Sequence, residues 1–80
     1  MSNDDSNYQP ISCETYSEFE LAIMRQHKLK MVWRIQGQTH IATVLPLDLI
    51  TREQQEFLLV EDHTDNTFQV RLDHIQSHDF

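Results

Sequence analysis

The sequence predicts an α+β domain that is mainly β, with an N-terminal helix packed on a small, strongly bent antiparallel sheet or open barrel of about five strands. Three observations predict this class. A chain of 80 residues is long enough for one domain with a modest core. Apolar residues have helical spacing near the N-terminus and alternate with polar ones from Leu29 onwards. The single glycine, Gly37, and the polar residues 62–66 lie where hairpins would turn.

The helix is predicted at about residues 14–26. Ser17 and Glu20 have the spacing of a capping box, in which the serine side chain accepts from a free backbone N–H and the glutamate reaches back to another. The helix would then turn one apolar stripe toward the sheet, made of Phe19, Ala22 and Ile23.

The first two strands are predicted to form a hairpin. Residues 29–35 alternate apolar and polar side chains, as a half-buried strand does. Gly37 provides the turn, and residues 39–45 form the return strand. Pro46 would end that strand or lie at a bulge, because proline has no backbone N–H to donate. Residues 46–55 are expected to be a connection between hairpins.

A second hairpin is predicted further along the chain. Phe57-Leu58-Leu59-Val60 is a continuous apolar run, which predicts a strand covered on both faces. Residues 62–66 form the polar loop, apolar and polar side chains alternate again over residues 68–73, and Ile75 would open a last short strand. A sheet of strands this short cannot be exposed to water on both faces. It is therefore expected to curl into a small barrel, which buries one face and removes the exposed edges. The helix would close one open end, as in Sm-like proteins. Residues 1–7 are expected to be a flexible acidic tail, and residues 8–80 a single Sm-like domain.

The chain is acidic, with 13 Asp and Glu against 6 Lys and Arg and a formal charge of −7. Such a surface repels nucleic-acid phosphates and anionic lipid, and it suits a basic protein partner. One cysteine, Cys13, cannot form an internal disulfide, so a reducing compartment fits best. The polar, acidic N-terminus does not resemble a signal peptide. A cytoplasmic location without membrane contact is expected.

The sequence does not predict an enzyme. A single glycine cannot build a phosphate-binding loop, and a single cysteine cannot supply a pair of zinc ligands. Cys13 is expected to be a small buried thiol under the helix rather than a nucleophile. No cofactor or metal site is therefore expected. The five histidines are expected to be solvated: His27, His40, His63, His74 and His78.

Direct RNA binding is the alternative function, because small barrels often bind RNA. Lys28, Lys30 and Arg34 share the polar side of one stretch, and the aromatic rings of Trp33 and Phe57 could stack on bases. Trp33, however, alternates in phase with the apolar residues of its strand, which predicts that it points into the core. The net negative charge also opposes the approach of phosphates.

Acidic residues crowd the N-terminal quarter of the chain and flank Tyr8 and Tyr16. Tyrosine beside charged residues is typical of interface centres. Favourable interaction with the helix dipole, about 0.3–1 kcal/mol each, would by itself explain Glu18 and Glu20. It does not explain the acidic pair Asp4-Asp5, which precedes the helix.

The motif Tyr8-x-Pro10-Ile11-x-Cys13-x-x-Tyr16, followed by Glu20-Leu21-Ala22, resembles the opening signature of the Rof (YaeO) family. The later pieces Phe57-Leu58-Leu59-Val60 and Arg71-Leu72-Asp73-x-Ile75 are similar to the family's later strands, so the resemblance covers about residues 7–76. It implies an Sm-like fold with an N-terminal helix. It also implies that the chain binds the hexameric transcription termination factor Rho at the primary RNA-binding site of its N-terminal domain, and so inhibits Rho-dependent termination.

The resemblance, together with the acidic clustering, gives a set of candidate Rho-binding residues. Ser17 stands where relatives can have aspartate, and Ile23 stands where they can have cysteine. The free chain is expected to be a monomer that does not bind nucleic acid directly. The candidate residues are Tyr8, Glu14, Tyr16, Ser17, Glu18 and Glu20.

Overall fold

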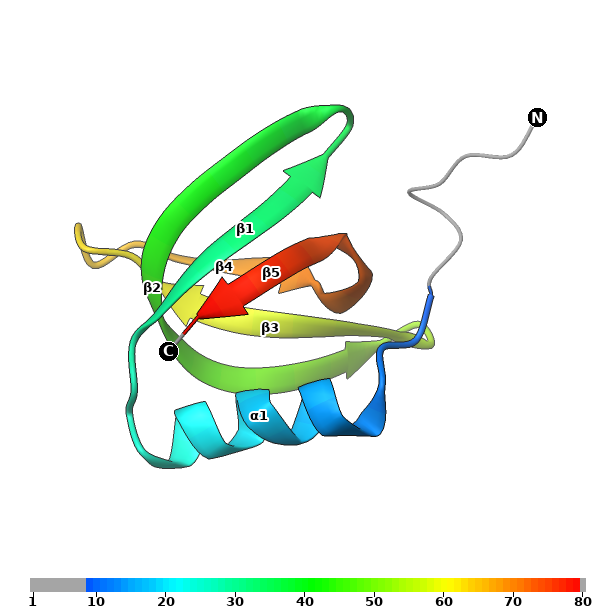
Figure 1. The fold of residues 1–80 in the computed structure, drawn as a ribbon, viewed down its shortest axis with the longest axis horizontal. Coiled ribbons are helices and arrows are strands. Elements are labelled where there is room, and N and C mark those ends of the chain that lie inside the picture. The colour runs from blue at the N-terminus through cyan, green and yellow to red at the C-terminus, as the bar shows by residue number, and fades with distance from the viewer. Residues whose placement is uncertain (1–8, 80) are drawn as a thin grey trace.

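The computed structural model describes residues 9–79, which form one helix followed by five strands (Figure 1). The predicted tail at residues 1–7 and the candidate residue Tyr8 lie outside this range. A short 3₁₀ turn, η1 (Leu72–His74), precedes the last strand. The other elements are α1 (Cys13–Met24), β1 (Leu29–Ile35), β2 (Gln38–Arg52), β3 (Gln55–Glu61), β4 (Thr67–Arg71) and β5 (Ile75–Asp79).

All five strands belong to one antiparallel sheet with the order β4-β3-β2-β1-β5. This confirms the predicted class of one helix on a strongly bent sheet. Within residues 9–79 the edge strands β4 and β5 do not pair with each other, so the sheet stays open and is not closed into a barrel. The expectation that curling would remove the edges is therefore wrong.

The helix begins at a different cap from the one predicted. Ser12 has extended backbone angles (φ −66°, ψ 154°), and its Oγ accepts from the backbone N–H of Thr15 at 3.2 Å. This bond satisfies a free N–H at the helix start, so the helix begins at Cys13, before Ser17 is reached. The predicted capping box of Ser17 and Glu20 is wrong, since both residues lie inside α1 and are exposed.

Strand β2 is much longer than predicted and carries the bend of the sheet (Figure 1). Its first part pairs with β1 and its second part with β3. The predicted connection at 46–55 is wrong, because β2 continues past Pro46 with a shift of register and no break. The turn into β3 consists of Glu53 (φ 51°) and Gln54 (φ 64°). Neither is a residue that favours positive φ, so this turn carries no local hairpin signal.

The other two hairpins were predicted correctly. Gly37 (φ 80°) follows Gln36 (φ 50°) in the turn from β1 to β2, where both residues must have positive φ. In the 62–66 loop, Asp62 Oδ1 accepts from the backbone N–H of Thr64 at 2.8 Å and of Asn66 at 3.1 Å. These bonds hold the loop in its turn conformation.

The core lies between α1 and the sheet. Phe19 and Ala22 from the predicted stripe are buried, and Ile23 is half-buried. Trp33 is buried, as its phase in the strand predicted. Leu58 and Val60 are buried, whereas Phe57 and Leu59 on the other face of β3 are half-buried. This part of the strand is therefore fully covered on one face and partly covered on the other. The remaining core residues are Leu29, Met31, Val44, Val70 and Leu72.

Candidate functional site

Five of the six candidate residues lie on α1 within the described part of the chain. Glu14, Ser17, Glu18 and Glu20 are exposed, and Tyr16 is half-buried. The helix buries Phe19 and Ala22 against the sheet, and therefore directs its acidic side chains to solvent. Burial of these carboxylates would have ruled out an electrostatic role, and they are not buried.

Along one edge of the helix, Glu18 contacts the last strand. Its Oε1 lies 2.6 Å from Nε2 of His78, on β5. The His78 ring also packs on Phe19, with ring centroids 4.8 Å apart. His78 is thus tucked between helix and strand, and the expectation of a solvated histidine is wrong for it and for His74, which is also largely buried. Glu18 remains half exposed.

Along the other edge, Tyr16 lies among carboxylates from three elements. Its hydroxyl hydrogen-bonds with Glu56 of β3, and Glu20 of α1 and Asp48 of β2 add negative charge. Burial first, and then the charges of Glu56 and Glu20, raise the pKa of Tyr16 above its ordinary value of 10.0. Tyr16 is therefore a neutral phenol at physiological pH, held beside an acidic group.

Sequence reasoning missed Asp48 and Glu56. They are far from α1 in the sequence and join it only through the β2–β3 hairpin, which was predicted as a connection. No local spacing marks them. The acidic surface consists of Tyr16 with the carboxylates of Glu14, Glu18, Glu20, Asp48 and Glu56.

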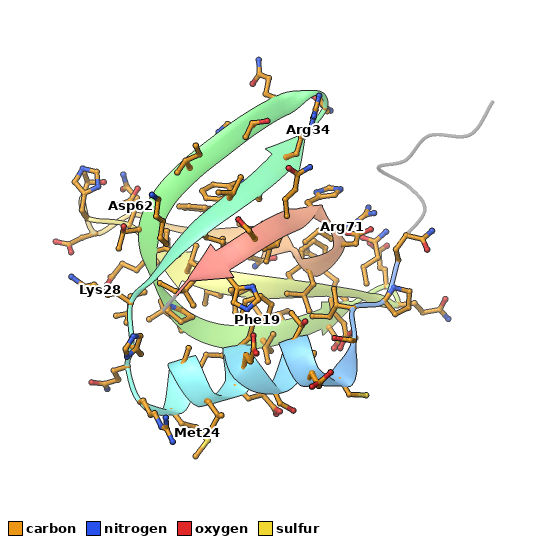
Figure 2. The ribbon with its side chains drawn as sticks, viewed as in Figure 1. Phe19, Met24, Lys28, Arg34, Asp62 and Arg71 are labelled. Atoms are coloured by element: carbon orange, nitrogen blue, oxygen red, sulfur yellow. The ribbon has the colours of Figure 1, made fainter. Side chains whose placement is uncertain are left out.

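Basic side chains gather elsewhere. Four of the six basic residues lie within 25–34, from the end of α1 into β1. Figure 2 shows Arg34 near the tip of the β1–β2 hairpin, well away from α1. The guanidinium of Arg52 lies 4.5 Å from the centroid of the Phe57 ring. Arg34 is therefore remote from the acidic surface, whereas Arg25, at the end of α1, lines a hollow together with Glu18.

A buried ion pair fixes the segment that enters the helix. Arg71 donates to both oxygens of Asp73, at 2.7 Å from Nε and 2.6 Å from Nη2. Asp73 Oδ2 also accepts from the backbone N–H of Gln9 at 3.0 Å. Burial by itself would raise the pKa of Asp73, but the bonds from Arg71 and Gln9 outweigh it and lower that pKa. The start of the described chain is thus tied to η1.

Other chemistries find little support in the described residues. Across 9–79, no three His, Cys, Asp or Glu side chains are grouped to hold a metal ion. Cys13 is exposed, so its predicted burial is wrong. Trp33 is buried and stacks on His40 (5.5 Å, 18°), which removes it as a platform for RNA bases. No helix in this part of the chain is long and apolar enough to cross a membrane.

Comparison with known proteins identifies a family whose members resemble this chain. The family model described as Modulator of Rho-dependent transcription termination (ROF) matches residues 10–79. Protein rof of Escherichia coli (strain K12) is 34% identical over 73 residues, which cover 91% of this chain and 82% of that protein. Protein rof of Shigella flexneri matches with the same identity and coverage. The stretch matched by the family model contains α1 and all five strands.

Proposed function

The chain belongs to the family of modulators of Rho-dependent transcription termination, and we propose that it inhibits termination by blocking the primary RNA-binding site in the N-terminal domain of Rho. The observation that carries the proposal is the acidic surface, which gathers five carboxylates from α1, β2 and β3. A site that binds RNA phosphates must be basic. An acidic protein can compete for it by placing carboxylates where phosphates would lie.

Electrostatics alone would give modest affinity. An exposed ion pair contributes about 0.2–1 kcal/mol, whereas several together steer association and fix the orientation of the two proteins. Tyr16 is held neutral and half-buried among the carboxylates, so it can donate or pack at the centre of the contact. Tyr8 remains a proposed contact, as do Glu14, Ser17, Glu18 and Glu20. The proposal includes a monomeric chain, no cofactor and a cytoplasmic location.

The test is neutralisation of two carboxylates on the acidic surface. Glu18→Gln with Glu20→Gln removes two charges, and glutamine at 18 can still hydrogen-bond with His78. A matched control, Glu61→Gln with Asp65→Asn, removes two charges near the 62–66 loop, where asparagine tolerates the positive φ of Asp65 (65°). Inhibition of termination by purified Rho should weaken about two- to thirtyfold in the first variant, as expected for the loss of two ion pairs of about 0.2–1 kcal/mol each, and by clearly less in the control.

Three results would bear directly on the proposal: the salt dependence of binding, the inhibition by the first variant, and the retention of RNA by the chain alone. Because the ion pairs are exposed, binding to Rho should weaken as salt rises. Full inhibition by the first variant would refute the assignment of the acidic surface. Direct RNA binding, the alternative, rests on the exposed Lys28, Lys30 and Arg34. Retention of single-stranded RNA by the chain alone at physiological salt would favour it over the proposal.

A further inference from the structure

Two large apolar side chains are exposed on the solvent face of α1. Leu21 is 45% exposed and Met24 is 78% exposed. They are three residues apart, so they are neighbours on the same side of the helix. Figure 2 shows Met24 projecting from α1 away from the sheet, whereas Phe19 points toward it. One exposed apolar residue is ordinary, but these two adjoin on the face that carries the candidate contacts.

Charged residues and a hollow surround this pair, and Arg25 at the end of the helix is its basic neighbour. Helical spacing places Ser17 one turn before Leu21, with Glu14 and Glu18 on one side and Glu20 on the other. Beside Leu21 lies a shallow, mainly apolar hollow. The hollow is lined by Glu18, Leu21, Ala22, Arg25 and His27. An apolar centre within a charged rim is the arrangement found at protein interfaces.

We propose that Leu21 and Met24 form the apolar centre of the binding surface, and that their partner is a basic protein cleft built for single-stranded nucleic acid. The identity of that partner as Rho rests on the proposed function. Clefts for single strands combine cations that hold phosphates with apolar and aromatic groups that stack on bases. A competitor needs both features. The carboxylates match the phosphates, and Leu21 and Met24 match the bases.

The side-chain types fit this role. Methionine is flexible and polarisable, so Met24 can adapt to a pocket shaped for a flat ring. The rim carboxylates make salt-dependent contacts, whereas burial of Leu21 and Met24 contributes affinity that is nearly independent of salt. The two contributions can therefore be separated by measuring affinity at several salt concentrations.

The experiment uses the full chain with Leu21→Gln and Met24→Gln, because glutamine keeps the length and the helix propensity. Binding to purified Rho hexamer is measured at four salt concentrations. We expect Kd to rise about tenfold or more at each concentration, with an unchanged slope of log Kd against log salt. Both side chains are exposed, so the unfolding midpoint should stay near that of the unchanged chain.

Ile41→Thr provides the matched control, since Ile41 is 64% exposed on β2 and threonine preserves strand propensity. We expect its Kd to stay within twofold of that of the unchanged chain. Unchanged affinity of the Leu21 and Met24 variant, a changed salt slope, or an equal loss in the Ile41 variant would each overturn the inference. If the unchanged chain did not bind Rho at all, the proposed function itself would fail, which is a different result.

Discussion

Loss of either partner of the buried Arg71–Asp73 pair should strongly destabilise the fold. Both side chains are only 6% exposed, and two hydrogen bonds of 2.6 and 2.7 Å join them. Asp73→Asn removes the charge and leaves a buried guanidinium facing an amide. Breaking a buried pair by removing one partner costs about 3–5 kcal/mol. The total free energy of unfolding of a chain of 80 residues is expected to be about 4–12 kcal/mol.

Asp73→Asn should therefore lower the free energy of unfolding by about 3 kcal/mol or more, measured by urea unfolding followed by far-UV circular dichroism. Arg71→Met should cost a similar amount, because the carboxylate then stays buried without its main partner. The double variant should cost clearly less than the sum of the two, since neither charge is then left alone. A loss below 1 kcal/mol in Asp73→Asn, or additive losses in the double variant, would refute this reasoning.

The same pair gives a pH dependence. The pKa of Asp73 is lowered in the folded chain from its ordinary 3.8, mainly through the bonds from Arg71 and Gln9, which outweigh burial. The stability that this carboxylate contributes is present above its ordinary pKa and is lost as pH falls through the lowered folded pKa. Asp73→Asn should accordingly lose less stability than the unchanged chain between about pH 5 and 2. Parallel acid-unfolding curves would contradict the assignment.

Three further predictions concern the helix cap, the tyrosine and the glycine. Ser12→Ala should cost about 1 kcal/mol in urea unfolding because the Thr15 N–H loses its acceptor, and Ser12→Asp should restore it. The pKa of Tyr16, followed by absorbance at alkaline pH, should lie above its ordinary value of 10.0, and Glu56→Gln should reduce that shift. The neutral phenol therefore contributes folding stability below pH 10, and this contribution is lost as pH rises through the raised pKa. Gly37→Ala should cost about 1–2 kcal/mol in thermal or urea unfolding because its φ is 80°, whereas Gly37→Asn should cost less.

Local patterns predicted the elements, but long-range contacts decided the details. Alternation from Leu29 and the position of Gly37 located the first hairpin, because a half-buried strand and a turn are both visible within a few residues. The helix start was predicted within one residue of Cys13, but the cap was assigned to Ser17, whereas the Ser12 side chain is the one that bonds the free Thr15 N–H. The β2–β3 hairpin was missed because its turn, Glu53-Gln54, contains no glycine, asparagine or aspartate.

The missed hairpin also explains why the candidate site was only partly predicted. The β2–β3 pairing places Ile50 opposite Phe57 and brings both Asp48 and Glu56 close enough to act on Tyr16. Glu18 likewise meets His78 only because β5 pairs with β1. Charge clustering along the sequence identified the helix face, whereas folding of the sheet extended that face onto β2 and β3. An acidic surface spread over three elements presents carboxylates at fixed positions, as a competitor for a phosphate-binding cleft requires, which a free acidic tail could not do.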